Sequence, residues 1–197
     1  SSIISNIKTG IYHDSINAIR MAKGMGKPER ADQLKKELLA FTPSATFKDG
    51  RKKELLTAYS GCVHLDFDKL TPEELQQAFD LAVKIPFTYA CFTSPSGDGL
   101  KVFIKVNTDH DTHEQAYKQV QAFYEKEISI EADPKCKDIT RLCFCSFDPE
   151  LFVNENSEVF FVIESRVEPK TNEVGKSSST QHPASSNDTV IYEHAVR

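Results

Sequence analysis

The sequence lacks the features of membrane, secreted and zinc-stabilised proteins. No apolar run approaches the roughly 18 residues that suggest a transmembrane helix, and no charged segment precedes an apolar one at the start, as in a secretory leader. The five cysteines are an odd number, and none forms the C-x-x-C pair typical of structural zinc sites. We expect a soluble protein with no membrane partner, and free thiols favour the reducing cytoplasm.

Several catalytic signatures are also missing. The glycine-containing residues 94–99 lack the Gly-Lys-Ser/Thr ending of a Walker A loop. No grouping of serine, histidine and aspartate suggests acyl transfer. His110 and His113 have no evident third ligand, and no His-x-His strand supports a rolling-circle nicking enzyme.

Length and charge indicate one main domain with a small accessory lobe. The 197 residues carry a net charge of -5, yet residues 20–53 hold ten basic and four acidic residues, a net charge of +6. Such a basic flank can follow nucleic-acid phosphates, because lysine and arginine displace condensed counterions. A solvated helical face explains it equally well. The first residue is Ser1, not methionine, so we expect a piece of a longer protein.

Apolar spacing predicts an N-terminal helical lobe over residues 1–58. Helices are expected over residues 12–24 and from Pro28 onward, and residues 41–51 are interpreted as a connection.

The following residues predict an α+β domain over residues 59–166. Expected strands are residues 63–68, 87–94, 100–106 and 141–146, with an added edge strand at 159–163. Capping boxes at Thr71/Glu74 and Asp111/Glu114 open two helices. The order is that of a ferredoxin/RRM-like split βαβ antiparallel sheet with helices on one face. Residues 167–197 are rich in serine, threonine, asparagine, proline and lysine and are predicted to be a disordered linker or tail.

The first strand of this domain carries the candidate metal ligands. Its apolar residues alternate with Asp66 and Asp68, so both carboxylates point to the open face of the sheet. The same rule places Lys101, Phe103 and Lys105 of the third strand beside them. Paired carboxylates suit Mg²⁺ or Mn²⁺, and the lysines would balance the charge of a triphosphate. Solvent-facing aspartates at a strand end are the simpler explanation of the same pattern.

Two further features have two interpretations each. Residues 94–99 could cradle a phosphate on backbone N–H groups, or form an ordinary hairpin turn. Arg141 could clamp a phosphate or base, or pair with Asp138.

These segments together resemble the archaeo-eukaryotic primase superfamily. The run Cys62-Val-His-Leu-Asp-Phe-Asp68 resembles its first motif, Ser94-Pro-Ser-Gly-Asp-Gly-Leu-Lys-Val-Phe103 its second, and Ala132-Asp133 its third. More closely, roughly residues 30–165 are similar to the VirE N-terminal-like, BT4734-like proteins of Bacteroides, primase-polymerase-like domains often followed by a helicase-type ATPase.

The resemblance implies a nucleotidyltransferase site. It implies that Asp66, Asp68 and Asp133 hold two metals, Mg²⁺ or Mn²⁺, with Asp138 as an alternative third acid. It further implies that the second motif binds nucleotide phosphates, through Ser94, Ser96, Gly97, Gly99, Lys101 and Lys105, with Arg141 as a neighbouring clamp. Lys101 stands where the superfamily has a histidine, and lysine lacks imidazole's directional hydrogen bond.

Two hypotheses follow for function. The first is a metal-dependent, primase-polymerase-like domain of a mobile-element DNA replication protein, acting on nucleoside triphosphates and a nucleic-acid strand. The second is an inactive RRM-like module that binds single strands, with Phe103 as a stacking platform.

Overall fold

The central sheet is built from strands whose apolar residues alternate with polar ones. In the computed structural model, which describes residues 2–163, its strands lie in the order β4-β6-β5-β8, each antiparallel to its neighbour. Their bounds are β4 Cys62–Phe67, β5 Thr88–Thr93, β6 Leu100–Lys105 and β8 Phe152–Val153. The register sets Asp66 opposite Lys101. The α+β class is confirmed, and β4, β6 and β5 have the order expected of a split βαβ sheet.

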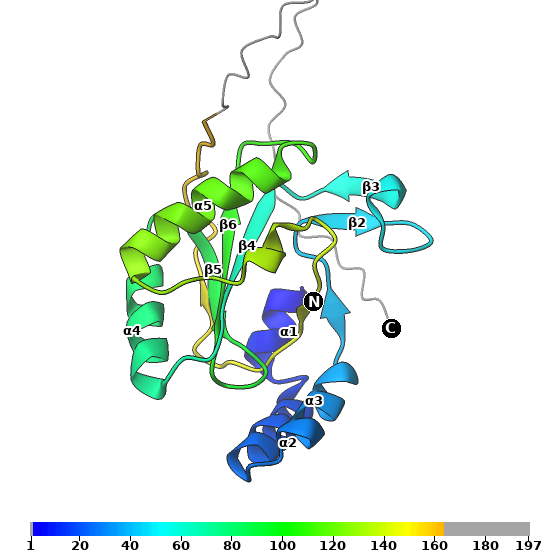
Figure 1. The fold of residues 1–197 in the computed structure, drawn as a ribbon, viewed down its shortest axis with the longest axis vertical. Coiled ribbons are helices and arrows are strands. Elements are labelled where there is room, and N and C mark those ends of the chain that lie inside the picture. Colours follow the sequence, from blue (N-terminus) through cyan, green and yellow to red (C-terminus); the bar gives the residue numbers. More distant parts are fainter. Residues whose placement is uncertain (1, 164–197) are drawn as a thin grey trace, which may run out of the picture.

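Two helices cover one face of this sheet, as predicted (Figure 1). They are α4, Pro72–Ala82, and α5, His113–Ile128. The capping box of α4 is confirmed, because Thr71 accepts from the Glu74 backbone and Glu74 accepts from the Thr71 backbone. The capping box predicted for α5 is wrong: its N-cap, Thr112, makes no side-chain cap bond, and the carboxylate of Asp109 accepts from the Thr112 N–H instead.

The opposite face is covered as well, so the predicted open face is wrong. Helix α1, Ile3–Thr9, packs Ile3 and Ile7 against apolar side chains of that face (Figure 1). A two-stranded ladder, β1 Ala40–Phe41 with β7 Cys143–Phe144, adds to the same cover. Because Phe92 and Phe103 on this face are apolar, their burial stabilises the cover.

The predicted fourth strand also lies elsewhere. Residues 143–144 pair with β1 and not with the edge of β4. That edge is met by the segment of the short helix η2, Pro134–Lys137, where the Asp133 N–H donates to the Asp66 carbonyl at 2.8 Å. The expected edge strand at 159–163 forms one parallel bridge, between Val106 and Phe160, and the edge strand is β8.

The remaining N-terminal elements comprise two predicted helices and an unpredicted hairpin. Helices α2, His13–Gly24, and α3, Pro28–Lys36, pack on each other, which confirms the two helices expected there. Strand β2, Ala45–Phe47, lies within the predicted connection and pairs with β3, Leu56–Tyr59, which follows it. They form an antiparallel hairpin that projects beside the sheet, with the short helix η1, Lys53–Leu55, in its loop (Figure 1). The tail predicted over 167–197 lies outside the described residues.

The helices and the cysteines of the described residues also bear on the sequence-based expectations. No helix in residues 2–163 is both long enough and apolar enough to span a membrane. All five cysteines are buried free thiols. The domain boundaries at 58 and 166 stay predictions.

Candidate functional site

The candidate site begins with a buried ion pair between two central strands. Lys101 Nζ donates to Asp66 Oδ2 at 2.5 Å, and the two residues are only 6% and 8% exposed. Burial is the largest single influence and disfavours charge on both groups, but the neighbouring charges and the hydrogen bond between the two groups together outweigh it, so the pKa of Asp66 is lowered and that of Lys101 is raised. Both groups are therefore charged at neutral pH. The alternation of β4 and β6 correctly predicted that these side chains meet.

The second carboxylate of the motif lies just beyond the end of β4. Asp68 is exposed, and partial desolvation together with the charge of Asp66 raises its pKa. Asp66 Oδ1 is buried and accepts no hydrogen bond from the described residues. Asp66 thus has a carboxylate oxygen that accepts no hydrogen bond from the described residues, and it lies beside Asp68, whose ionised form is disfavoured. A cation between them would relieve both conditions.

The 94–99 turn packs directly against this strand end. The Ser94 N–H donates to the Gly99 carbonyl at 2.7 Å, and Gly97 has a φ of 78°, which favours glycine. A Cβ on Gly99 would lie 2.7 Å from the Phe67 carbonyl oxygen and 3.0 Å from Asp68 Oδ1. Glycine at position 99 therefore permits the close approach of turn and strand. The turn is a hairpin connection between β5 and β6, as one of the two interpretations held.

Helix α2 holds the outer side of this turn, which the sequence did not predict. Arg20 donates to the carbonyls of Ser94, at 3.2 Å, and Phe147, at 3.0 Å. Lys23 forms an ion pair with Asp98. The net charge of +6 over residues 20–53 was the available signal, but it could not tell which cations reach the turn.

A cavity of about 220 Å³ lies where α2 and α3 meet the turn. Three lysines and three aspartates, Asp32, Asp68 and Asp98, contribute to its wall, and Ser96 of the turn adds a hydroxyl. The lysines are Lys23, Lys35 and Lys69. The charge of Lys35 also acts on Asp66 and Asp68 and favours their ionised forms, although the pKa of Asp68 is raised on balance. The cavity therefore combines cationic side chains with one carboxylate of the motif.

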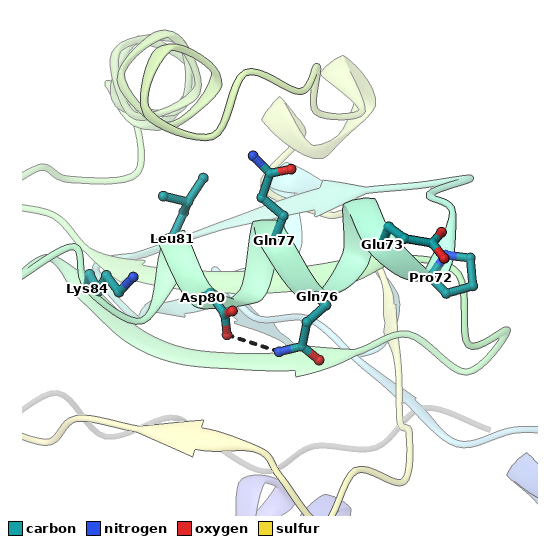
Figure 2. Close-up of a pocket in the computed structure, with 7 residues that line it drawn as sticks. All are labelled: Pro72, Glu73, Gln76, Gln77, Asp80, Leu81 and Lys84. Carbon is teal, nitrogen blue, oxygen red and sulfur yellow. Dashed lines mark hydrogen bonds between the residues drawn. The ribbon is translucent and has the colours of Figure 1, made fainter.

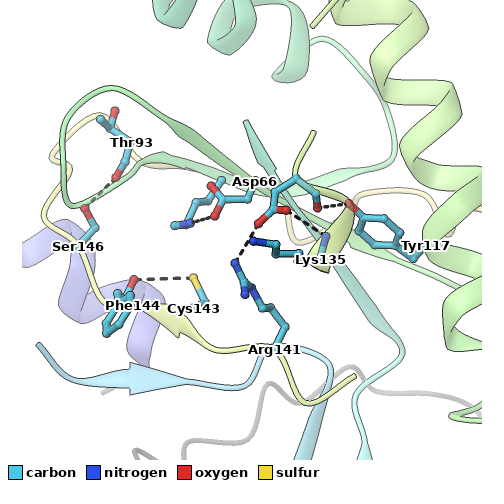
Figure 3. Close-up of polar contacts among 10 residues, drawn as sticks. Asp66, Thr93, Tyr117, Lys135, Arg141, Cys143, Phe144 and Ser146 are labelled. Carbon is cyan, nitrogen blue, oxygen red and sulfur yellow. Dashed lines mark hydrogen bonds and ion pairs between the residues drawn. The ribbon is translucent and has the colours of Figure 1, made fainter. Parts of the chain in front are cut away.

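The third predicted acid lies beside the first. Figure 3 shows Arg141, Tyr117 and Lys135 converging next to Asp66. The contacts run through Asp133, whose Oδ2 accepts from Arg141 at 2.9 Å and whose carbonyl accepts from the Tyr117 hydroxyl at 2.7 Å. Asp133 is therefore the acid next to Asp66.

The alternative third acid has a different role in the structure. Asp138 Oδ1 accepts from the N–H and the hydroxyl of Thr140, both at 2.9 Å. Arg141 pairs with Asp133, so the predicted Arg141–Asp138 ion pair is wrong.

Two predicted residues do not reach the site. Lys105 lies opposite Cys62, at the far end of the ladder from Asp66, where its Nζ donates to the Glu155 carbonyl at 2.8 Å and lies over the Tyr89 ring. Phe103 is 1% exposed, stacked between neighbouring rings beneath the cover of this face. A stacking platform at Phe103 is therefore wrong. Alternation along β6 correctly predicted that Phe103 and Lys105 lie on the same face as Lys101, but it could not predict which elements cover that face.

The three aspartates do not form a ready metal cage. In residues 2–163, no group of three or more histidine, cysteine, aspartate or glutamate side chains is arranged to hold a metal ion. Asp133 is engaged by Arg141, which leaves Asp66 Oδ1 and Asp68 as the free oxygen donors. Oxygen donors suit Mg²⁺ or Mn²⁺, whose remaining positions accept water or phosphate oxygens. The donor set fits one such cation, and the metal stays a prediction.

A larger hollow on α4 has a different character. It measures about 610 Å³ and is lined by one helix, with Gln76 bonded to Asp80 at 3.0 Å (Figure 2). Most of its side chains are exposed and polar, while Leu81 is half-buried and packs on the core (Figure 2). No buried charge or orphaned polar atom of the described residues adjoins it. The hollow carries no chemistry comparable to the Asp66 site.

Comparison with known proteins identifies a family. The family model described as BT4734-like, N-terminal domain, matches residues 33–152. This match includes Asp66, Asp68, the 94–99 turn and Asp133, but not Arg20 or Lys23. No curated protein and no solved structure matches the chain.

Proposed function

The chain belongs to the family of BT4734-like N-terminal domains, and from this premise we propose that it is a metal-dependent, primase-polymerase-like nucleotidyltransferase. The carrying observation is the buried Asp66–Lys101 pair, which leaves Asp66 Oδ1 without a partner among residues 2–163, beside Asp68. A fixed carboxylate oxygen next to a second carboxylate provides a cation site, and the cavity beside it supplies lysines for phosphates. The substrates proposed are nucleoside triphosphates and a nucleic-acid strand of a mobile-element replication system.

The two free carboxylates would hold one Mg²⁺ or Mn²⁺ ion. When bound, the cation supplies charge neutralisation and Lewis-acid polarisation of the phosphates. Lys101 fixes Asp66 by binding Oδ2, so that Oδ1 keeps one direction. In this assignment Lys101 is a positioning residue: its ammonium group is already committed to Asp66 and is 6% exposed.

The phosphates would lie over the lysines of the cavity. Lys35 and Lys69 line it together with Ser96, and these groups are charged or polar donors toward an anion. Lys23 also forms an ion pair with Asp98, and this pair holds the 94–99 turn in place. Transfer would follow by attack of a strand's 3′-hydroxyl on the α-phosphate, with Arg141 and Asp133 beside the reacting groups.

The alternative, an RRM-like module that stacks bases on its sheet, has less support. Base stacking needs exposed aromatic rings, and the ring expected to serve, Phe103, is buried. The nucleotide site is therefore preferred.

A binding experiment separates these functions. Mn²⁺ binding is followed by electron paramagnetic resonance, with and without a non-hydrolysable nucleoside triphosphate, for the wild type and for Asp66→Asn and Asp68→Asn. We expect the triphosphate to tighten Mn²⁺ binding in the wild type and both variants to lose at least about tenfold in affinity, since each removes a charged ligand. Asp80→Asn on α4 is the control with the same charge change. Equal Mn²⁺ affinity in all four proteins would contradict the proposal, and primer extension that survives Asp66→Asn would contradict the catalytic part.

A further inference from the structure

The β2–β3 hairpin carries a group of exposed basic side chains outside the proposed nucleotide site. Lys48, Arg51, Lys52 and Lys53 are all exposed, and none forms an ion pair with a described residue. Two acids, Asp49 and Glu54, lie in the same loop, so it keeps a net positive charge. The ammonium groups of Lys48, Lys52 and Lys53 are therefore free of carboxylate partners within the described residues.

A second basic segment touches this hairpin. The Arg51 guanidinium donates to the Thr140 carbonyl, which joins the hairpin loop to the segment that contains η2. That segment adds Lys135 and Lys137, both exposed. Lys137 is paired with Glu114, and the Lys135 ammonium group forms no ion pair within residues 2–163, although the Lys135 backbone N–H donates to Asp133. The basic surface is hereafter the four hairpin residues together with Lys135 and Lys137.

A chain of contacts leads from the basic surface to the candidate site. Arg141, next to Thr140, donates to Asp133 at 2.9 Å. The Asp133 N–H then donates to the Asp66 carbonyl at 2.8 Å. A long anion that lies on the basic surface would therefore have one end beside Asp66.

The surface suits phosphates better than a protein partner. Protein interfaces have an apolar centre, and the exposed large hydrophobic residues of the described chain all lie elsewhere. They are Ile11, Met21, Met25, Val153, Phe161 and Ile163. Flexible lysines without fixed partners suit a repeating backbone charge, because they bind phosphates without reading a sequence.

We infer that the basic surface binds the phosphate backbone of the nucleic-acid strand that enters the Asp66 site. The inference rests on the proposed function for the identity of the strand as a substrate. Binding by this surface needs neither a metal nor a nucleotide, since the lysines act through charge alone. Binding of the strand is therefore weakened by salt and unchanged by metal chelators.

The test is a salt titration of binding to a fluorescein-labelled oligothymidylate, read by fluorescence anisotropy with EDTA present. The probe variant combines Lys48→Gln, Lys52→Gln and Lys53→Gln. The control combines Lys84→Gln, Lys118→Gln and Lys126→Gln, which makes the same charge change on α5 and beyond the end of α4. Each phosphate contact on a single strand contributes about 0.7 to the slope of log affinity against log salt. Because three lysines are replaced, we expect the magnitude of the slope to fall by about 2 in the probe variant. The control should keep the wild-type slope.

Two results would overturn the inference. One is a probe variant whose slope and affinity equal those of the control. The other is wild-type protein that ignores the oligonucleotide but sediments with anionic phospholipid vesicles, which would assign the surface to a membrane. The EDTA in this titration separates the inference from the proposed function: oligonucleotide binding by the basic surface is expected without any metal ion, so a protein that fails to bind Mn²⁺ still binds the oligonucleotide.

Discussion

Asp66 has one carboxylate oxygen bound to Lys101, and its other oxygen has no partner in the described part of the chain; both residues are buried. A buried ion pair stabilises a fold weakly when intact, but removal of one partner leaves an uncompensated charge. The pair therefore keeps an acid charged in a buried position. Such a carboxylate is suited to hold a cation.

Replacement of Lys101 by methionine tests the dependence of Asp66 on its partner. The variant leaves the Asp66 carboxylate buried without a counter-charge, so we expect the free energy of unfolding to fall by about 3–5 kcal/mol at neutral pH. The loss is smaller in acid, because protonated Asp66 carries no charge to compensate. Urea denaturation at several pH values measures both effects. Lys105→Met, on the same strand but outside the site, is the control, and a Lys101→Met protein as stable as this control would contradict the assignment.

His113 predicts a pH dependence of stability. It is 2% exposed, and burial is the main cause that lowers its pKa from 6.5 to about 4. Below about pH 6.5 the unfolded chain binds a proton at this residue that the folded protein refuses, so stability falls as the pH drops from about 6.5 to about 4. One such group contributes a slope of about 1.4 kcal/mol per pH unit within that window. Buried His64, with its pKa lowered to about 3, adds a slope of the same sign.

The His113→Gln variant isolates this contribution. We expect its unfolding free energy to depend less steeply on pH, by about one proton's slope, in denaturant titrations between pH 4 and 6.5. His110→Gln is the matched control, because the His110 side chain is 52% exposed. An unchanged slope in His113→Gln would show that His113 is not kept neutral by burial.

At the scale of elements, the site depends on how the 94–99 turn meets the end of β4. Gly99 lies against the Phe67 carbonyl and Asp68, and Arg20 of α2 holds the opposite side. Helix α2 precedes the residues matched by the family model, so a region outside that match supports a motif inside it.

Gly99→Ala tests this close approach. The new Cβ would lie 2.7 Å from a backbone oxygen, which cannot move without shifting the strand end. Overpacking of this kind costs about 1–3 kcal/mol, and we expect weaker Mn²⁺ binding as Asp68 is displaced. Gly24→Ala is the control, since a Cβ there meets nothing within 4 Å. We expect Gly99→Ala to have a lower melting temperature than Gly24→Ala in thermal unfolding. Equal melting temperatures would contradict this packing.

At the scale of the whole molecule, helix α1 covers one face of the sheet. Ile7 is fully buried against that face. We expect Ile7→Ala to lower the free energy of unfolding by about 2–5 kcal/mol, the usual cost of a cavity at a buried isoleucine. Ile11→Ala, with 64% of the residue exposed, should change it by less than about 0.5 kcal/mol. If Ile7→Ala is equally mild, α1 does not cover the sheet in solution.

Local patterns predicted the parts of the fold and site that depend on neighbouring residues. Period-two alternation predicted that Asp66 and Lys101 share a face, and the Thr71 capping box gave the start of α4. The cover of that face could not be predicted, because it depends on long-range packing of α1 and on a β1–β7 ladder of two residue pairs. The contact between Arg20 and the 94–99 turn joins residues 74 apart in sequence. No periodicity encodes a contact of that kind.

The central claim is that Asp66 and Asp68 hold a divalent cation under a nucleoside triphosphate. The most direct test is a crystal soaked with Mn²⁺ and a non-hydrolysable triphosphate, read by anomalous scattering. We predict an anomalous peak within about 2.0–2.6 Å of oxygens from both Asp66 and Asp68, with phosphate density toward Lys35 and Lys69. A soaked crystal with triphosphate bound elsewhere and no anomalous peak at the two aspartates would contradict the account.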